Sequence, residues 1–342
     1  MVYLFYGAHR FREDFEAIVQ SLETALGKAK VAEKTPIVVK EFAGADVPFD
    51  ERGEEWIRRA AFSHSSRVWS VRLRVVHKFM KSSVNSERRD FVTGKKPLSE
   101  FLPGGGDEGF GLAFYEFLRS RNIRFVLENL GFEAWILGEM QKLLDRDITR
   151  LFTTWDDLSY FNLSTTRINL TVRKDQRRDH DLALQIRRMA KKRSISPMVV
   201  RGSMHSTTLE RSLKKLGVEF EVLVPSMGSF PPREDVIGKR QIDGKVDTEL
   251  SDDERLQLLR HPLYYEFEYI LRNSTRSGSH LSSDQVTQHV GPIIDRWTRQ
   301  DLDVYFRSSL VRQYCIYLWI EKNCTEAEKR RFHHYRTLGQ IG

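Results

Sequence analysis

Four short apolar runs in this chain are each followed by one or more ionisable side chains. The runs span residues 3–6, 37–39, 125–127 and 198–200, and the side chains that follow them include His9, Glu41, Glu128, Arg201 and His205. In open parallel sheets, ligands bind in the crevice outside the carboxyl ends of the strands. If the four runs are parallel strands of one sheet, these five side chains converge on one crevice.

Apolar residues at helical spacing alternate with these runs. The expected helices span residues 11–26, 110–120, 132–146, 179–192 and 207–216. Gly217 is placed to end the last of them, and a fifth strand is expected at 220–224. Strands that alternate with helices predict an α/β fold with a mostly parallel sheet flanked by helices.

Four segments differ from this alternation. Residues 50–110 are polar and basic, and we expect an inserted basic helical segment there; residues 147–171 are aromatic and are expected to be irregular. Prolines, glycines and charges at 227–250 indicate a linker. Beyond the linker, only helical patterns occur, at 254–273, 283–297, 301–322 and 325–338. The sequence therefore predicts an α/β core domain at 1–235 and a C-terminal helical domain or cap at 250–342.

Composition places the chain among globular proteins. Of its 342 residues, 40% are hydrophobic and 11% aromatic, which is enough for a sizeable core. The formal net charge of +8 suits an acidic partner, but the charges are interspersed rather than gathered in a tail. Two cysteines without metal-ligand spacing, no basic start and no apolar run of about 18 residues predict a cytoplasmic protein.

Two glycine–histidine elements follow predicted strands. In residues 202–205, Gly-Ser-Met-His lies between a β-branched strand and a helix, and residues 7–9, Gly-Ala-His, have the same setting. A tight turn there would present His205 beside a helix N-terminus, which favours anions. Histidines at two strand ends can hold a metal or transfer protons. The simpler interpretation of either histidine alone is a capping or surface residue.

The order of the C-terminal pieces resembles a known superfamily. Arg178-Asp179, a helix, the strand ending in Gly202-Ser203-Met204-His205, a helix and another strand look like the core of the erythromycin esterase, ChaN, TraB–PrgY and Tiki proteins. Members also carry an N-terminal glycine/histidine element and a glutamate after the second apolar strand, which match Gly7, His9 and Glu41 here. The resemblance covers residues 1–225 in scattered pieces, and the N-terminal element departs from the usual spacing.

The resemblance implies a hydrolase that acts on an ester, a peptide or another anionic substrate, or a binding protein. His9 and His205 would face one another across the sheet edge. One would act as a general base on water, or both would bind a divalent metal ion with Glu41, Glu128 or both. Arg178 and Arg201 would hold an anionic substrate group or the oxyanion.

Two other functions stay open from the sequence. Residues 58–96 interleave cations with Trp69, Phe79 and Phe91, which is a pattern that can stack on nucleic-acid bases, although a solvated basic helix explains it more simply. The C-terminal helices are rich in aromatic residues, which either form a helical core or a surface for a homo-oligomer. The sequence thus leaves a hydrolase, a nucleic-acid- or nucleotide-acting protein and a non-catalytic interaction protein as candidates.

Overall fold

A computed structural model describes most of the chain outside the predicted insertion. The described residues are 1–7, 12–40, 114, 117, 118, 120–128, 132–151, 156–225, 230–274, 281, 283–308 and 312–340. They divide into two compact units, one within Met1–Gly131 and Arg178–Met227 and the other within Phe132–Arg177 and Gly228–Gly342. This division differs from the expected one, which grouped residues 132–177 with the sheet. His9, Glu41 and residues 58–96 lie outside the described residues.

The first unit is built on a five-stranded sheet whose strands are all parallel. The strands are β1 (Val2–Gly7), β2 (Thr35–Lys40), β3 (Arg124–Leu127), β4 (Ile195–Gly202) and β5 (Phe220–Val224). Their order across the sheet is β3-β2-β4-β1-β5, so β4 lies between β1 and β2. The predicted parallel α/β fold is therefore confirmed, and all five strands form where the apolar runs predicted them.

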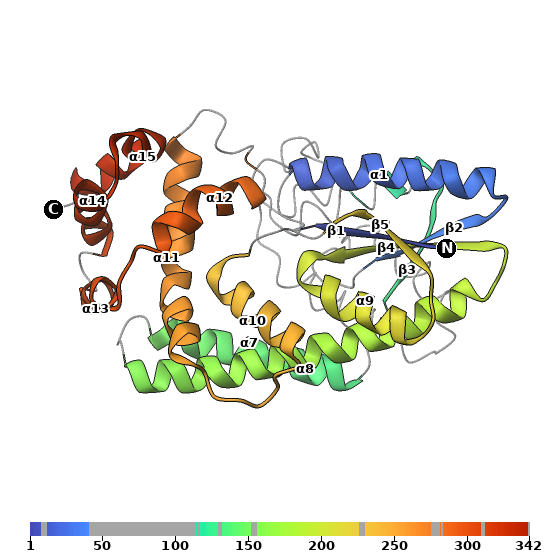
Figure 1. Cartoon of the computed structure of the whole chain (residues 1–342), viewed down its shortest axis with the longest axis horizontal. Helices are drawn as coiled ribbons and strands as arrows, with labels where there is room; N and C mark the ends of the chain where they lie inside the picture. The colour runs from blue at the N-terminus through green and yellow to red at the C-terminus, as the bar shows by residue number, and fades with distance from the viewer. Residues whose placement is uncertain are drawn as a thin grey trace, which may run out of the picture. The chain divides into compact units, whose positions relative to one another are not determined.

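Helices cover both faces of this sheet (Figure 1). On one face, α1 (Arg12–Val31) buries Ile18, Leu22, Ala25 and Ala29 against Val38, Phe125, Met198 and Val200. On the other face, the end of α8 (Asp157–Ala190) and all of α9 (Ser206–Lys215) pack on the strands. That core contains Leu182, Ala183, Ile186, Leu209 and Leu213 together with Tyr6, Val126 and Val199.

Helix α8 is far longer than the sequence predicted. It extends over 34 residues, Asp157–Ala190, whereas we expected irregular chain to residue 171 and a helix start at Asp179. The buried positions in its first two thirds are spaced at helical intervals but are largely polar, among them Ser164, Arg167, Thr171, Asp175 and Asp179. A search for apolar periodicity cannot detect a polar buried face. The expectation for 147–171 was wrong over residues 157–171 and also over 147–151, which belong to the preceding helix, α7 (Phe132–Leu151).

The second unit contains helices and no strand among its described residues. Its elements are α7 (Phe132–Leu151), the first part of α8, α10 (Pro232–Asp243), α11 (Asp252–Ser274), α12 (Ser283–Ile294), α13 (Arg299–Arg307), α14 (Arg312–Asn323), α15 (Glu326–Arg331) and the 3₁₀ helix η4 (His333–Gln340). The linker expected at 227–250 was wrong where α10 forms. Pro232 is compatible with a helix there because it occupies the first turn, where its missing N–H needs no partner.

The C-terminal helices agree with the sequence except at two breaks. The helix expected at 301–322 is two helices, α13 and α14, and Ser308 leaves the helical conformation at the end of α13. The helix expected at 325–338 becomes 3₁₀ from His333. Thr325 caps α15 in a reciprocal capping box with Glu328.

The aromatic side chains of these helices form the core of the second unit. Trp297 and Trp319 stack with ring centroids 4.7 Å apart, and Phe267 meets both of them edge-on. Tyr264, Tyr305 and Phe306 are also buried. Packing within the second unit therefore explains many of the aromatic residues of the C-terminal helices. The surface for a homo-oligomer stays a prediction.

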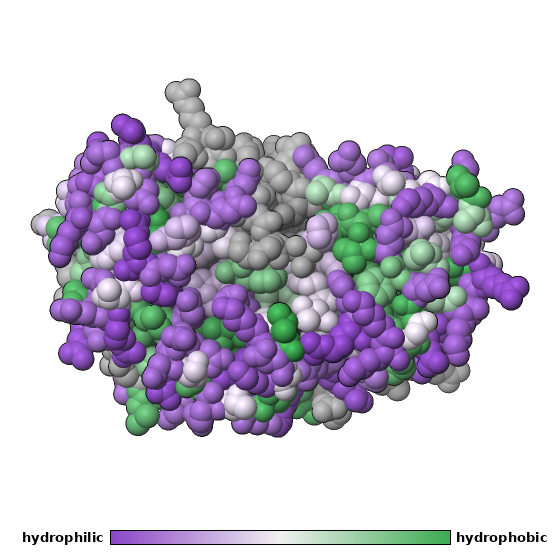
Figure 2. Space-filling view, viewed as in Figure 1, coloured by the Kyte–Doolittle hydropathy of each residue, from purple (hydrophilic) through white to green (hydrophobic). Residues whose placement is uncertain are grey.

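Hydrophilic side chains predominate on the face of the chain shown in Figure 2, where hydrophobic ones occur in small groups. Within the described residues, every helix falls short of the length and apolar character that crossing a bilayer requires.

Candidate active site

A carboxylate–imidazole pair lies at the carboxyl end of the central strand. His205 ends the 3₁₀ turn η2 (Ser203–His205), which follows β4 directly and leads into α9. Its Nδ1 lies 3.1 Å from the carboxylate oxygens of Asp179 on α8. Asp179 precedes Leu182 and Ala183 by three and four residues, so it lies one turn along the helix face that packs on the sheet. The packing of α8 therefore positions the carboxylate.

Arg201, the penultimate residue of β4, joins this pair to a second carboxylate. Its Nη2 donates to Asp179 Oδ1 at 2.9 Å, and its Nη1 donates to Glu128, which follows β3. Arg178 donates to the other oxygen of Glu128. Register explains the convergence, because Arg201 and Glu128 share the strand face of Val199 and Val126, which packs against α8 and α9.

The cluster is almost fully withdrawn from solvent. Arg201 and Asp179 are 0% exposed, Glu128 is 1% exposed and His205 is 6% exposed. Two guanidinium groups and two carboxylates balance one another in formal charge, as buried ions require. Thr208, also buried, donates its hydroxyl hydrogen to Asp179 Oδ2. Buried charges that are paired and hydrogen-bonded in this way fix the position of each side chain.

The hydrogen bonds assign the ring proton of His205. Two groups approach His205 Nδ1: the carboxylate of Asp179 at 3.1 Å, and Nη2 of Arg201 at the longer distance of 3.3 Å. The carboxylate is an acceptor and is closer to the ring, so we place the proton on Nδ1, where it is donated to Asp179. In the neutral ring, the lone pair is then on Nε2, which is the form that a general base needs.

The surroundings of Asp179 favour its ionised form. Burial, the largest effect, would raise the pKa of this carboxyl, but the charges of His205 and Arg201 and the hydrogen bonds from His205 and Thr208 outweigh it and hold the pKa below its ordinary value. Asp179 therefore stays a carboxylate that can orient His205 and stabilise its protonated form.

Tyr6 lies in register with Arg201 on the neighbouring strand and is 1% exposed. Burial, followed by the charges of Glu210 and Asp179, raises the pKa of its phenol. The hydroxyl therefore stays protonated at neutral pH.

The structure brings together four of the six residues that the sequence singled out for the site, namely Glu128, Arg178, Arg201 and His205. Two of them make contacts that the sequence did not predict, because both oxygens of Glu128 accept from arginines and Arg201 is fully buried between two carboxylates. Such a geometry favours positioning over substrate contact for Glu128 and Arg201. The strands β1 and β2, which precede His9 and Glu41, lie on either side of β4.

The sequence did not identify Asp179 or Thr208 as members of the site. Asp179 opens the helix expected at 179–192, and an acidic residue in the first turn of a helix is explained by the helix dipole alone. The signal that could have found it is its spacing, since Asp175, Asp179, Leu182 and Ile186 lie on one helix face. Thr208 follows His205 by three residues, which places both at the beginning of α9.

The described residues alone do not make a metal site. No group of three or more His, Cys, Asp or Glu side chains among them could hold a metal ion. Two of the three predicted ligands, His9 and Glu41, lie outside that part of the chain, so the metal stays a prediction.

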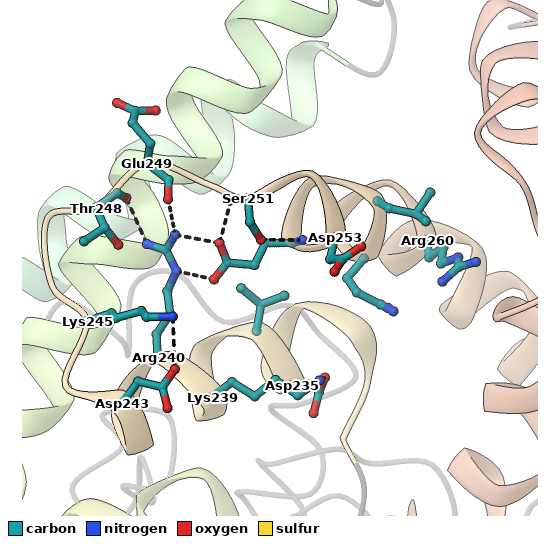
Figure 3. Close-up of a pocket in the computed structure, with 14 residues that line it drawn as sticks. Asp235, Lys239, Arg240, Asp243, Lys245, Thr248, Glu249, Ser251, Asp253 and Arg260 are labelled. Atoms are coloured by element: carbon teal, nitrogen blue, oxygen red, sulfur yellow. Dashed lines mark hydrogen bonds and ion pairs between the residues drawn. The ribbon is translucent and has the colours of Figure 1, made fainter.

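A cavity of about 560 Å³ in the second unit lies between α10, α11 and the segment that joins them (Figure 3). Its cations are largely neutralised, because Arg240 pairs with Glu254, Lys239 with Asp235 and Lys245 with Asp243. None of its described lining residues is a histidine or a cysteine. The cavity therefore lacks a side chain that commonly transfers protons near neutral pH, and the Asp179–His205 pair remains the candidate site.

No family model, curated protein or solved structure matches this chain in comparisons with known proteins. The resemblance drawn from residues 1–225 therefore stays a prediction.

Asp179 should give the chain a stability that depends on pH. A carboxyl whose folded pKa is depressed stabilises the fold above its unfolded pKa, about 3.9, and this contribution is lost as pH falls through the folded pKa. We expect the free energy of unfolding to fall more steeply below about pH 5 in the wild type than in Asp179→Asn. Urea unfolding of both proteins between neutral and acidic pH measures this, and parallel curves would contradict it.

Proposed function

We propose that this protein is a hydrolase in which His205, oriented by Asp179, acts as a general base on water. The observation that carries the proposal is the buried pair itself, with Nδ1 of His205 3.1 Å from the Asp179 carboxylate at the carboxyl end of β4. A histidine that donates Nδ1–H to a carboxylate is the arrangement in which Nε2 accepts a proton. Its place at the carboxyl edge of a parallel sheet is where α/β proteins bind ligands.

The proposed reaction is hydrolysis of a carboxylic ester. Nε2 of His205 removes a proton from water while the water oxygen attacks the carbonyl carbon. Asp179 stabilises the imidazolium that forms. The tetrahedral intermediate then breaks its bond to the alkoxide, which takes the proton from Nε2, so that an acid and an alcohol leave and His205 returns to its neutral form.

Glu128, Arg178 and Arg201 hold the pair in place. Arg201 donates to the carboxylates of Glu128 and Asp179, and Glu128 also accepts from Arg178. These four side chains therefore connect β3, β4 and α8. Of these, Arg178 keeps the greatest exposure, with 11% of its side chain accessible. We assign Arg178 to contact with the substrate and Arg201 to positioning.

A cavity of about 590 Å³ along α9 supports an anionic substituent on the substrate. The residues that line it begin at Ser206, directly after His205, and include Arg211, Lys214 and Lys215. These three cations exceed the one carboxylate in the lining, that of Glu210. The proposal therefore covers esters that carry an acidic group at a distance from the bond that is cleaved.

A substrate panel tests this function. Wild-type protein and His205→Ala, purified in parallel, are incubated with nitrophenyl carboxylic esters, nitrophenyl phosphates and a fluorogenic peptide. We expect ester hydrolysis by the wild type and its loss in His205→Ala, with the same circular dichroism spectrum for both proteins. Equal activity of the two proteins, or turnover of none of the esters, would refute the proposal.

The predicted metal ion is tested separately by elemental analysis of the purified protein and by repeating the ester assay after dialysis against a chelator. A bound divalent metal, whose removal abolishes activity, would support the predicted ligands His9, Glu41 and His205. Activity that survives complete removal of metal would limit the chemistry to the side chains.

A further inference from the structure

The hydroxyl of Ser203 is buried and has no hydrogen-bond partner among the described residues. Ser203 is 4% exposed, and it opens the 3₁₀ turn that ends with His205. A buried hydroxyl without a partner is unusual, because most buried polar groups are hydrogen-bonded to protein or to ordered water. Leaving one unpaired destabilises the folded state, so its presence needs an explanation.

The position of Ser203 connects it to the proposed site. It follows Gly202, whose register partner is Gly7, the last residue of β1. The two central strands therefore end side by side in residues that have no side chain, and glycine in a strand often marks a place where a ligand approaches the backbone closely. Ser203 is the first residue after β4, and His205 comes two residues later.

We propose that Ser203 donates a hydrogen bond from its hydroxyl to the carbonyl oxygen of the ester that His205 hydrolyses. This inference rests on the proposed function and adds to it a side chain that stabilises the oxyanion. The described charges of the site favour this role for a neutral donor, because the guanidinium of Arg201 is buried between Glu128 and Asp179. The hydrogen bonds of Arg201 are directed to Glu128 and Asp179, whereas the hydroxyl of Ser203 can donate its hydrogen to a substrate.

The chemistry requires no covalent step at Ser203. As water adds to the carbonyl carbon, the carbonyl oxygen becomes negative, and a hydrogen bond from the serine hydroxyl becomes stronger. When the tetrahedral intermediate breaks down, the oxygen returns to a carbonyl and the hydroxyl keeps its proton. Because the bond is strongest in the transition state, its loss lowers kcat more than it changes KM.

The test replaces Ser203 with alanine and measures stability and catalysis together. We expect the urea midpoint of Ser203→Ala to equal or exceed that of the wild type, because the variant removes an unpaired buried group. With a nitrophenyl ester, we expect kcat to fall about 10- to 1000-fold with little change in KM. Thr208→Val removes a hydroxyl that does have a partner, Asp179, and should lower the urea midpoint. Ser212→Ala, a serine on α9 outside the site, should change neither quantity.

Each outcome decides between structural and functional roles. A lower urea midpoint for Ser203→Ala would show that the hydroxyl stabilises the fold and would overturn the inference, whether or not a substrate is known. Unchanged kcat in Ser203→Ala beside loss of activity in His205→Ala would overturn the inference and leave the proposed function standing. Hydrolysis that is independent of His205 would instead reject the proposed function itself.

Discussion

Replacing Asp179 with asparagine should lower kcat for ester hydrolysis about 10²- to 10⁴-fold. The amide would keep the shape of the side chain but carry no charge, so it would neither favour the Nδ1–H form of His205 nor stabilise its protonated ring. Arg201 donates to Oδ1 and Thr208 to Oδ2 of Asp179, so the single amide oxygen keeps one of these two acceptor positions. The measurement is kcat and KM for Asp179→Asn, with circular dichroism to confirm the fold.

A matched control is available on the same helix. Asp175 is also buried and lies four residues earlier, where it accepts from Gln241 and pairs with Lys174. Asp175→Asn removes a buried carboxylate whose partners, Gln241 and Lys174, are not members of the cluster around His205, and it should leave kcat within about threefold. Equal losses in both variants would show that any buried charge on α8 matters, and would contradict the role given to Asp179.

Replacing Glu128 with alanine should lower the free energy of unfolding by about 3–5 kcal/mol. Both oxygens of Glu128 accept from arginines, and its removal leaves the buried cluster with two guanidinium groups, those of Arg178 and Arg201, and one carboxylate, that of Asp179. The measurement is urea unfolding of wild type and variant. Glu128→Gln keeps the volume of the side chain and one acceptor oxygen, so its free energy of unfolding should fall by less. This variant is measured instead if Glu128→Ala does not fold.

The control for Glu128 is an ion pair at the surface. Glu23 and Arg121 approach to 2.6 Å, but both side chains are largely exposed. Glu23→Ala should therefore change the free energy of unfolding by less than about 1 kcal/mol. A change of that small size in Glu128→Ala would mean that the buried network does not hold the site together.

The sheet could be predicted from the sequence because its strands are short apolar runs with clear ends. Buried parallel strands appear as continuous apolar residues, and residues 3–6 and 198–200 are such runs. The convergence of Glu128, Arg201 and His205 followed from strand ends alone, without knowledge of any contact. Gly217 adopts a φ of +64° after α9, as expected of a glycine that ends a helix.

The rest of the site depends on contacts that no local pattern contains. Arg201 looked like a substrate-binding residue because nothing in the sequence says that Glu128, 73 residues away, lies against it. Asp179 was missed because the helix that carries it buries polar side chains at Ser164, Thr171 and Asp175. A search for apolar periodicity therefore reveals neither the length of α8 nor the carboxylate that it carries.

The measurement that tests the account most directly is a double-mutant comparison of Asp179→Asn, His205→Ala and the variant that carries both, using kcat/KM for one ester. If the two side chains act as one unit, removing His205 already removes the contribution of Asp179, and the double variant should hydrolyse the ester at the rate of His205→Ala. Losses that multiply in the double variant, or a His205→Ala protein that is as active as the wild type, would contradict the proposed mechanism.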